Sequence, residues 1–273
     1  MHAAMSAEAA RHGRIWGARA AAWAEEEAAE APKYEEPLAR AGIAPGWVVL
    51  DVGCGAGAFL ALAARRGARV AGLDASEALL AIARRRVPDA NLRLGDMQRL
   101  PFGDDAFDAV TGFNSFSLVP DMAAAVREAG RVARPGAPVV IQVWGRPERV
   151  GLTQMFAALR ALRGAPPPGP PLATPGALEA VAEAAGLPPG EAFDVAVTLA
   201  YPDEPALLRR MLSPGPVAEL VDAVGEEAVT EAILRSLAPC RSPDGGYRVA
   251  TEWRTLIARA GAGVRPAPGT GSG

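Results

Sequence analysis

The sequence predicts an α/β fold: a Rossmann-like, doubly wound, seven-stranded and mostly parallel sheet with an N-terminal helical lid and a helical insertion near the C-terminus. Between residues 47 and 144, short and continuously apolar runs alternate with helix-like segments, which is typical of parallel strands joined by helices. A glycine-rich stretch at residues 53–57 follows the first apolar run. Two later runs, at residues 192–201 and 246–257, are also strand-like, which brings the expected number of strands to seven.

The elements of the first half follow in a regular order. Residues 1–40 are Ala-rich and polar with spaced aromatic residues, and from residue 18 onward they predict one or two helices. Five strands are expected next, at residues 47–51, 69–74, 92–96, 107–113 and 138–144. Helices are expected between them, at residues 57–66, 76–88 and 121–134. Ser76 and Asp121 are expected to cap two of these helices, because short polar side chains accept backbone N–H bonds there.

The second half of the chain has a different rhythm. A proline-rich stretch at residues 165–171 predicts a rigid linker. Helices are expected at residues 175–186, 204–212 and 216–237. The last two would form an insertion over the sheet, ahead of a final strand or strand–helix unit. The expected organisation is a helical lid at residues 1–40, a ligand-binding Rossmann-like core at 41–150, a cap that completes the sheet at 151–260 and a disordered tail at 261–273.

Composition and charge exclude several kinds of partner. The 28 basic and 31 acidic residues nearly cancel, and no basic stripe could follow a nucleic-acid backbone. No apolar run is long enough for a membrane helix, so neither nucleic acid nor membrane is expected as a partner. The two cysteines, Cys54 and Cys240, are too few for a metal cluster and predict a reducing, cytoplasmic location. A monomer or a homodimer is expected.

The glycine-rich stretch locates the expected ligand site. In an open parallel sheet, ligands bind at the carboxyl ends of the strands, where glycine-rich turns expose backbone N–H groups. Residues 53–58 also satisfy the dinucleotide pattern G-x-G-x-x-G/A, and Asp74 has the spacing of a ribose-binding acid. An NAD-dependent oxidoreductase is therefore an open alternative. The chain has a single lysine, Lys33, and so lacks the Tyr-x-x-x-Lys pair of short-chain enzymes.

Four motifs in fixed order resemble those of the class I S-adenosylmethionine (SAM)-dependent methyltransferases. They are LDVGCGAG at residues 50–57, GLDAS at 72–76, GDM at 95–97 with LPF at 100–102 and FDAV at 107–110, and RVARPG at 131–136. The resemblance is close over residues 45–145. It is specifically to the small-molecule branch similar to the ubiquinone and menaquinone biosynthesis methyltransferases, the type 11 methyltransferase domain. Ala137 departs from the pattern, because a second glycine is more usual there.

This resemblance implies a SAM-binding core and an enzyme that methylates a small-molecule acceptor, with S-adenosylhomocysteine as the product. Asp51 would help to hold the methionine amine while glycine amides face the methionine carboxylate. Asp74 would accept the ribose hydroxyls, and Asp96 the adenine amino group. The residues assigned to the cofactor in this way are Trp16, Asp51, Gly53, Gly55, Gly57, Asp74, Ala75, Leu79, Asp96, Met97, Phe113 and Asn114.

Each of these assignments has a structural alternative. The glycines could serve only close packing, Asp74 could cap a helix, and Asp96 could stabilise a turn. Met97, expected to cover the adenine ring opposite Ala75 and Leu79, could instead fill the core. The aromatic residues of the lid could form a helix-packing face.

The transfer chemistry leaves few residues to assign. By resemblance, Phe113 and Asn114 lie near the cofactor's sulfonium. Residues 114–117 read NSFS and do not match the Asn-Pro-Pro-Tyr type motif of enzymes that methylate nucleic-acid bases. No catalytic base is assigned, since the only histidines, His2 and His12, are interpreted as solvated residues of the lid.

The cap indicates the character of the acceptor. Its apolar, proline-rich composition predicts a moderately hydrophobic metabolite, with Tyr201, Arg241 and Tyr247 as candidate pocket residues. A SAM-fold binding protein without transfer activity is a third reading, because intact motifs argue for binding and not for turnover.

Overall fold

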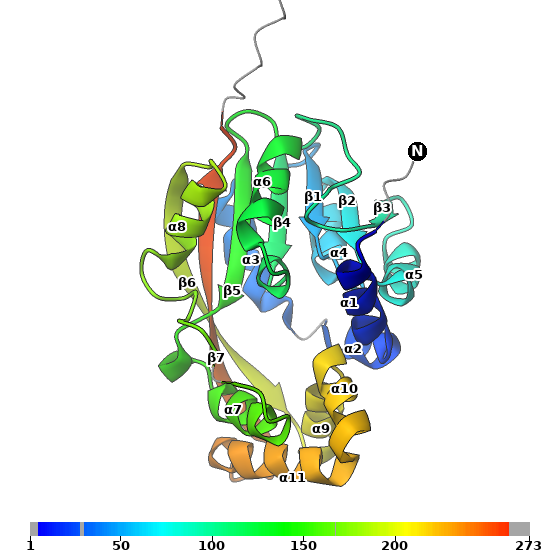
Figure 1. Ribbon diagram of the computed structural model, residues 1–273, viewed down its shortest axis with the longest axis vertical. Helices are drawn as coiled ribbons and strands as arrows, with labels where there is room; N and C mark the ends of the chain where they lie inside the picture. The colour runs from blue at the N-terminus through cyan, green and yellow to red at the C-terminus, as the bar shows by residue number, and fades with distance from the viewer. Residues whose placement is uncertain (1–4, 28–29, 167, 262–273) are drawn as a thin grey trace, which may run out of the picture.

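The sheet of the computed structural model has seven strands within the described residues, which are 5–27, 30–166 and 168–261. They are β1 (Val48–Val52), β2 (Arg69–Asp74), β3 (Asn91–Leu94), β4 (Ala109–Phe113), β5 (Pro138–Trp144), β6 (Pro189–Tyr201) and β7 (Tyr247–Arg259). The strand order is β3-β2-β1-β4-β5-β7-β6. β7 pairs antiparallel with β5 and β6, whereas the other neighbours pair parallel. The predicted seven-stranded, mostly parallel sheet is confirmed (Figure 1).

Helices cover both faces of this sheet. The helices are α1 (Ala7–Gly17), α2 (Ala20–Glu27), α3 (Pro32–Arg40), α4 (Ala58–Arg65), α5 (Glu77–Arg86), α6 (Met122–Val132), α7 (Thr153–Leu162), α8 (Ala177–Ala184), α9 (Glu204–Leu212), α10 (Gly215–Val224) and α11 (Glu226–Leu237), with short 3₁₀ turns η2 (Phe116–Leu118), η3 (Pro147–Arg149) and η4 (Ala238–Cys240). One core lies between the sheet and α6 and α8, and a second lies between the opposite face and α3, α4 and α5. The doubly wound arrangement is visible in Figure 1.

Two predicted helix caps are confirmed. The hydroxyl of Ser76 accepts a hydrogen bond from the amide of Leu79 at 3.4 Å and begins α5. The carboxylate of Asp121 accepts one from the amide of Ala124 at 2.9 Å and begins α6. Both caps place the following helix directly after a loop at the carboxyl edge of the sheet, where ligands bind in this fold.

The structure corrects several boundaries. The single helix expected at residues 216–237 is two helices, α10 and α11, because Gly225 adopts φ +91° between them, a conformation that ends a helix. α1 and α7 were not anticipated individually. The last run is a strand throughout and not a strand–helix unit, since all of β7 pairs with β6 or β5. The expected disordered tail lies outside the described residues, apart from residue 261.

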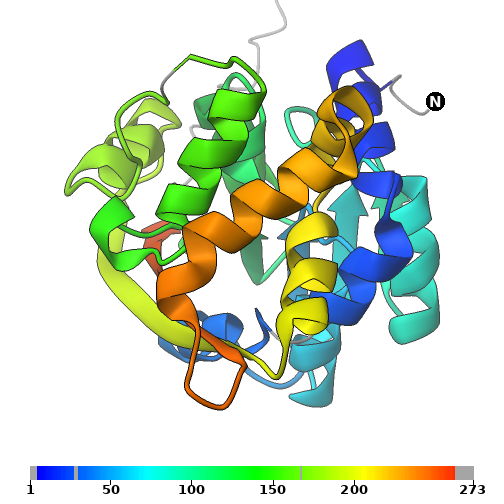
Figure 2. The ribbon, with the colours of Figure 1, turned by 90° about the horizontal axis from the view of Figure 1, so that it is seen from below.

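β6 and β7 carry the helical cap. Each has 13 residues, and the first part of β7, up to residue 252, pairs with β6 alone. This two-stranded extension runs past β5 into a separate apolar core formed with α7, α9, α10 and α11. Figure 1 shows these helices gathered at the lower end of the molecule, and Figure 2, seen from below, shows α10 beside α1. The cap therefore lies over the carboxyl edge of the parallel strands.

Candidate functional site

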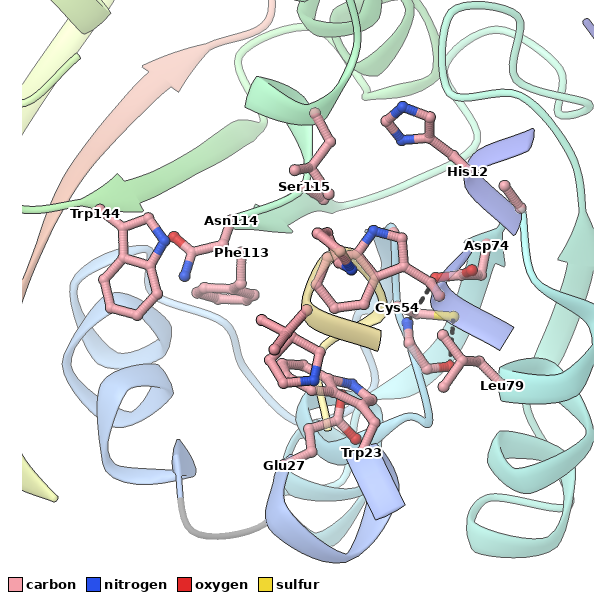
Figure 3. A pocket seen from close by; sticks show the side chains of 18 of the residues that line it. His12, Trp23, Glu27, Cys54, Asp74, Leu79, Phe113, Asn114, Ser115 and Trp144 are labelled. Carbon is pink, nitrogen blue, oxygen red and sulfur yellow. Dashed lines mark hydrogen bonds between the residues drawn. The ribbon is translucent and has the colours of Figure 1, made fainter. Parts of the chain in front are cut away.

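A cavity of about 620 Å³ lies between the carboxyl ends of the central strands, the N-terminal helices and the cap. All of the residues assigned to the cofactor line it except Gly57. Gly57 begins α4 with φ +84°, and a Cβ there would lie 3.2 Å from the Cβ of Ala83 on α5. Figure 3 shows how side chains from distant parts of the chain converge on this space. Whether the lining residues bind a cofactor stays a prediction.

The glycine loop leaves no room for side chains. A Cβ at Gly53, where φ is +76°, would overlap the Cβ of Ser115, and one at Gly55 would lie 2.8 Å from a carboxylate oxygen of Glu27. The amides of Gly53 and Cys54 both donate to the carbonyl of Leu73, at 2.7 and 3.0 Å. The close-packing alternative is thus also correct for these glycines, which pack tightly and line the cavity at once.

Asp74 ties two loops together at the end of β2. Its carboxylate accepts one hydrogen bond from the amide of Gly55 at 2.9 Å and another from the amide of Ser76 at 2.8 Å. Burial raises the pKa of this carboxyl, and the backbone N–H donors oppose the rise. Asp74 is not the helix cap of the alternative interpretation, because Ser76 caps α5. A carboxylate has about four acceptor positions, so ribose hydroxyls could still be accepted.

Asp96 connects the end of β3 to the N-terminal helices. One carboxylate oxygen accepts from the amide of Gln98 at 2.9 Å, so the turn alternative is correct as well. The other oxygen accepts from the hydroxyl of Ser6, the N-cap of α1, at 2.5 Å. A Cβ at Gly13 would overlap the carbonyl of Ala75, so α1 lies directly against the segment that follows β2. α1 therefore covers the predicted adenine position.

The lid aromatics and Met97 have double roles. The rings of Trp16 and Trp23 meet edge to face at 5.2 Å and pack with Leu79 in a small apolar cluster, and both tryptophans line the cavity. Met97 packs against the main core and also lines the cavity. The packing alternatives and the cavity-facing assignments hold together for these side chains.

Asn114 is in a strained position at the end of β4. Its φ is +55°, which is uncommon for a residue other than glycine, and its amide donates to the carbonyl of Gln142 at 2.9 Å. The Oδ1 atom is buried and has no hydrogen-bond partner among the described residues. Figure 3 shows Asn114 between Phe113 and Trp144. Asn114 therefore presents a buried acceptor at the cavity, and its binding of a ligand stays a prediction.

Two buried carboxyl groups near the glycine loop titrate close to neutral pH. Burial raises the pKa of Asp51 to about 8, opposed by the hydroxyl of Thr111, which donates to it at 2.7 Å. Burial also raises the pKa of Glu27 to about 7, opposed by Arg86 at 2.8 Å. The sequence did not point to Glu27. A bound ammonium would favour the ionised form of both groups.

We expect the stability of the cofactor-free protein to fall between about pH 4 and pH 8. Folding raises the pKa of Asp51 from 3.8 to about 8 and that of Glu27 from 4.5 to about 7, so both protons bind more tightly to the folded protein. The resulting contribution to the free energy of unfolding is complete below the pKa values of the unfolded chain and is lost as pH rises through those of the folded protein. Urea unfolding at pH 5, 6, 7 and 8 measures this slope. Asp51→Asn should flatten it, while the exposed control Asp89→Asn should not; an unchanged slope in Asp51→Asn would contradict the assignment.

A buried ion cluster joins the N-terminal helices to the cap. The carboxylate of Glu30 contacts both the ammonium of Lys33 and the guanidinium of Arg210 on α9. The Arg210 guanidinium also lies over the ring of Trp23 at 4.7 Å, and the Lys33 ammonium lies 5.3 Å from the centre of the Trp253 ring. Glu30, Lys33 and Arg210 line the cavity. Sequence analysis missed this cluster, because Arg210 is remote in the sequence and an acid three residues before a lysine usually marks a solvated helix face.

Some of the remaining candidate residues from the sequence line the cavity, and others do not. His12, expected to be solvated, lines the cavity. Tyr201 also lines it, together with Trp144, which the sequence analysis did not single out. Neither Arg241 nor Tyr247 lines the cavity. Arg241 is exposed, whereas Tyr247 is buried and its hydroxyl donates to the carboxylate of Glu204 at 3.4 Å. The proposed acceptor role of Arg241 and Tyr247 gains no support from this placement.

The sheet is Rossmann-like, and part of the chain matches the model of a known family. β7 lies antiparallel between β5 and β6, so the strand order differs from the 3-2-1-4-5-6 order of dinucleotide-binding sheets. In particular, residues 50–141 match the family model described as a methyltransferase domain. The resemblance found in the sequence to SAM-dependent methyltransferases is confirmed for this part of the chain, and the comparisons give the NAD alternative no support.

Curated relatives match part of the chain. The chain is 37% identical over 129 residues to methyltransferase GfsG of Streptomyces halstedii, covering 40% of this chain and 46% of that protein. It is 42% identical over 107 residues to demethylmenaquinone methyltransferase of Mycolicibacterium paratuberculosis, covering 39% of this chain and 45% of that protein. The chain spans about half the length of the curated relatives it matches.

Structural similarity alone does not decide the reaction. The crystal structure of the [4+2]-cyclase SpnF matches with a TM-score of 0.56 and 21% identity, covering 85% of this chain and 82% of that one. At this identity the match shows the fold, and one fold serves several chemistries. Within the described residues, no helix is long and apolar enough to cross a membrane.

Proposed function

We propose that this protein binds SAM and transfers its methyl group to an apolar small-molecule acceptor. The observation that carries the proposal is a single cavity whose wall joins the glycine loop and the carboxylates after β2 and β3 to the apolar inner face of the cap. The residues present fit the cofactor. The glycine cradle is closed to any Cβ, and Asn114 offers an unpartnered buried oxygen.

Each end of the cofactor has matching side chains in this site. Asp74 would accept the ribose hydroxyls, and Asp96 and Met97 would hold the adenine ring beneath α1. Asp51 and Glu27 bring two carboxyl groups to the loop where the methionine ammonium would lie. The amides of Gly53, Cys54 and Gly55 already donate to Leu73 and Asp74, so the methionine carboxylate would have to share these donors. The bound cofactor supplies an electrophilic methyl group on a sulfonium.

The chain's own contribution to transfer is alignment and exclusion of water. The cap lines one side of the cavity with apolar side chains, including Met155, Phe156 and Leu220, which would hold the acceptor's apolar body away from solvent. The Oδ1 atom of Asn114 would accept a hydrogen bond from the acceptor's hydroxyl or amine and orient its lone pair toward the methyl group. No general base is assigned.

Asp74→Ala tests the cofactor assignment. We expect it to weaken SAM binding by about 1–3 kcal/mol, because hydroxyls that lose a buried acceptor remain desolvated. Asp74→Asn should be intermediate, since it keeps one oxygen for the amides of Gly55 or Ser76, and Asp89→Ala is the exposed control. Calorimetric titration with SAM, S-adenosylhomocysteine and NAD gives the readout. Binding of NAD alone, or SAM affinity unchanged in a folded Asp74→Ala variant, would overturn the proposal.

Turnover separates an enzyme from a binding protein. Transfer of a labelled methyl group from SAM to members of an acceptor panel is expected for the enzyme, whereas the non-catalytic alternative predicts binding without transfer. The proposal also includes a lid at residues 1–40, a SAM-binding core at 41–150 and a cap at 151–260. A cytoplasmic location fits two free cysteines, Cys54 and Cys240, and a monomer or homodimer remains the expected state.

A further inference from the structure

The charges in the cavity wall are sorted by position. Within the described residues, every carboxylate of the wall comes from the N-terminal helices or the core, and these are Glu8, Glu27, Glu30, Asp51, Asp74 and Asp96. The cap contributes no acidic residue to the wall. Its charged contributions are three arginines, Arg160 and Arg163 near the end of α7 and Arg210 on α9. The cavity is thus acidic on the cofactor side and basic on the cap side.

The three arginines differ in their partners. Arg210 contacts Glu30, and Arg163 donates to Glu219 at 2.6 Å, a carboxylate that Arg11 of α1 also contacts at 2.8 Å. The side chain of Arg160 makes no hydrogen bond or ion pair with any described residue, although it is half-buried and lines the cavity. Arg160 is therefore the guanidinium on the cap side that has donors to offer a ligand.

Apolar side chains of the cap line the same cavity as Arg160. Leu159 and Met155 on the same helix and Leu220 on α10 are buried side chains of the cap core that line the cavity. A guanidinium binds carboxylates, phosphates and sulfonates through paired N–H donors, more strongly where apolar neighbours reduce screening by water. A ligand that fills this half of the cavity must present an apolar body to the wall and an anionic group to Arg160.

We propose that the acceptor is an amphipathic anion whose oxyanion group is held by Arg160. This inference rests on the proposed function, in which the acidic half of the cavity takes the cofactor, a molecule with a net positive charge. The acidic half of the cavity would then favour the positively charged cofactor, and the basic half would favour an anion. The three arginines disfavour a protonated amine on the cap side. Arg160 acts on the specificity for the acceptor and not on the transfer step.

Two fluorescent probes that differ by one charge test the inference. The first is 8-anilinonaphthalene-1-sulfonate and the second is N-phenyl-1-naphthylamine, which has the same aromatic skeleton without the sulfonate. Both are titrated into the full-length protein saturated with S-adenosylhomocysteine, so that the cofactor half is blocked. We expect the sulfonate to bind more tightly than the neutral probe. Arg160→Ala should weaken the sulfonate about tenfold and the neutral probe less than about twofold, because one charge-assisted contact is lost.

Matched variants separate charge recognition from packing. Arg160→Lys should retain most of the preference for the sulfonate, and Arg235→Ala, which removes an exposed guanidinium on α11, should leave both probes unchanged. Equal affinity of the two probes for the wild type, equal weakening of both in Arg160→Ala, or an unchanged sulfonate affinity in that variant would each overturn the inference. Calorimetry with S-adenosylhomocysteine keeps the two proposals apart: failure of that binding overturns the proposed function, whereas normal binding with probes insensitive to Arg160 overturns this inference alone.

Discussion

Replacing Glu30 with glutamine is expected to lower the free energy of unfolding at pH 7 by about 3–5 kcal/mol, the cost of leaving a buried charge without its partner. Lys33 is 4% exposed, and Glu30 supplies the only carboxylate within 4 Å of its ammonium among the described residues. Glutamine preserves the volume of the side chain, so the loss reports charge and not a cavity. Urea unfolding followed by circular dichroism measures the difference.

The pH dependence of this difference identifies its origin. The ion partners Lys33 and Arg210 overcome burial and lower the pKa of Glu30 from 4.5 to about 2. A lowered pKa contributes stability that is present above pH 4.5 and is lost as pH falls through about 2. The wild type and Glu30→Gln should therefore converge in stability in strong acid. A difference that is independent of pH would mean that packing, and not charge, explains the effect.

An exposed pair on the cap provides the control. Glu231 pairs with Arg235 one turn along α11, and the side chain of Glu231 is 67% exposed. Glu231→Gln should change stability little, because solvent screens such pairs. If it destabilises the protein as much as Glu30→Gln does, the special role of the buried cluster is excluded. A large difference would show that the ion cluster joins the N-terminal helices to the cap.

Much of the sheet was predictable because its signals are local. Short apolar runs such as residues 138–144, bounded by turn residues, predict strands buried on both faces, and the caps Ser76 and Asp121 mark helix starts through their own side chains. The break at Gly225, where φ is +91°, was missed because a single glycine in a helical pattern is often tolerated.

In the candidate site, too, the residues in local motifs were predictable and those placed by long-range contacts were not. Asp74 and Asp96 lie in motifs at the ends of strands, so their place at the cavity follows from strand order. Glu30 contacts Arg210, which lies 180 residues later in the chain, and Arg160 reaches the cavity because α7 packs against α10 and α11; no local pattern encodes these contacts. His12 was interpreted as solvated for the same reason, since the docking of α1 depends on Gly13 meeting the backbone at Ala75.

Gly53→Ala is expected to lower the free energy of unfolding by about 2–4 kcal/mol. Part of this is the cost of φ +76° for a residue with a Cβ, about 1–2 kcal/mol, and the rest is overpacking, because the new Cβ would overlap that of Ser115. The displaced loop should also bind SAM more weakly in calorimetry. Urea unfolding measures the stability.

Two further variants separate strain from collision. Gly42 has φ +71° with nothing within 4 Å of its would-be Cβ, so Gly42→Ala isolates the backbone cost. Ser115→Gly removes the Cβ that the new side chain of Gly53→Ala would meet. The Ser115 hydroxyl donates to the carbonyl of Val52 at 2.5 Å, and the loss of this bond is part of the cost of the single Ser115→Gly variant. A double-mutant cycle should then show that the two changes together cost less than the sum of their separate effects. Strictly additive changes in the free energy of unfolding, or equal losses in Gly53→Ala and Gly42→Ala, would mean that the loop accommodates the new Cβ without a collision. The contact with Ser115, which follows β4, would then not be the reason why the loop requires glycine at position 53.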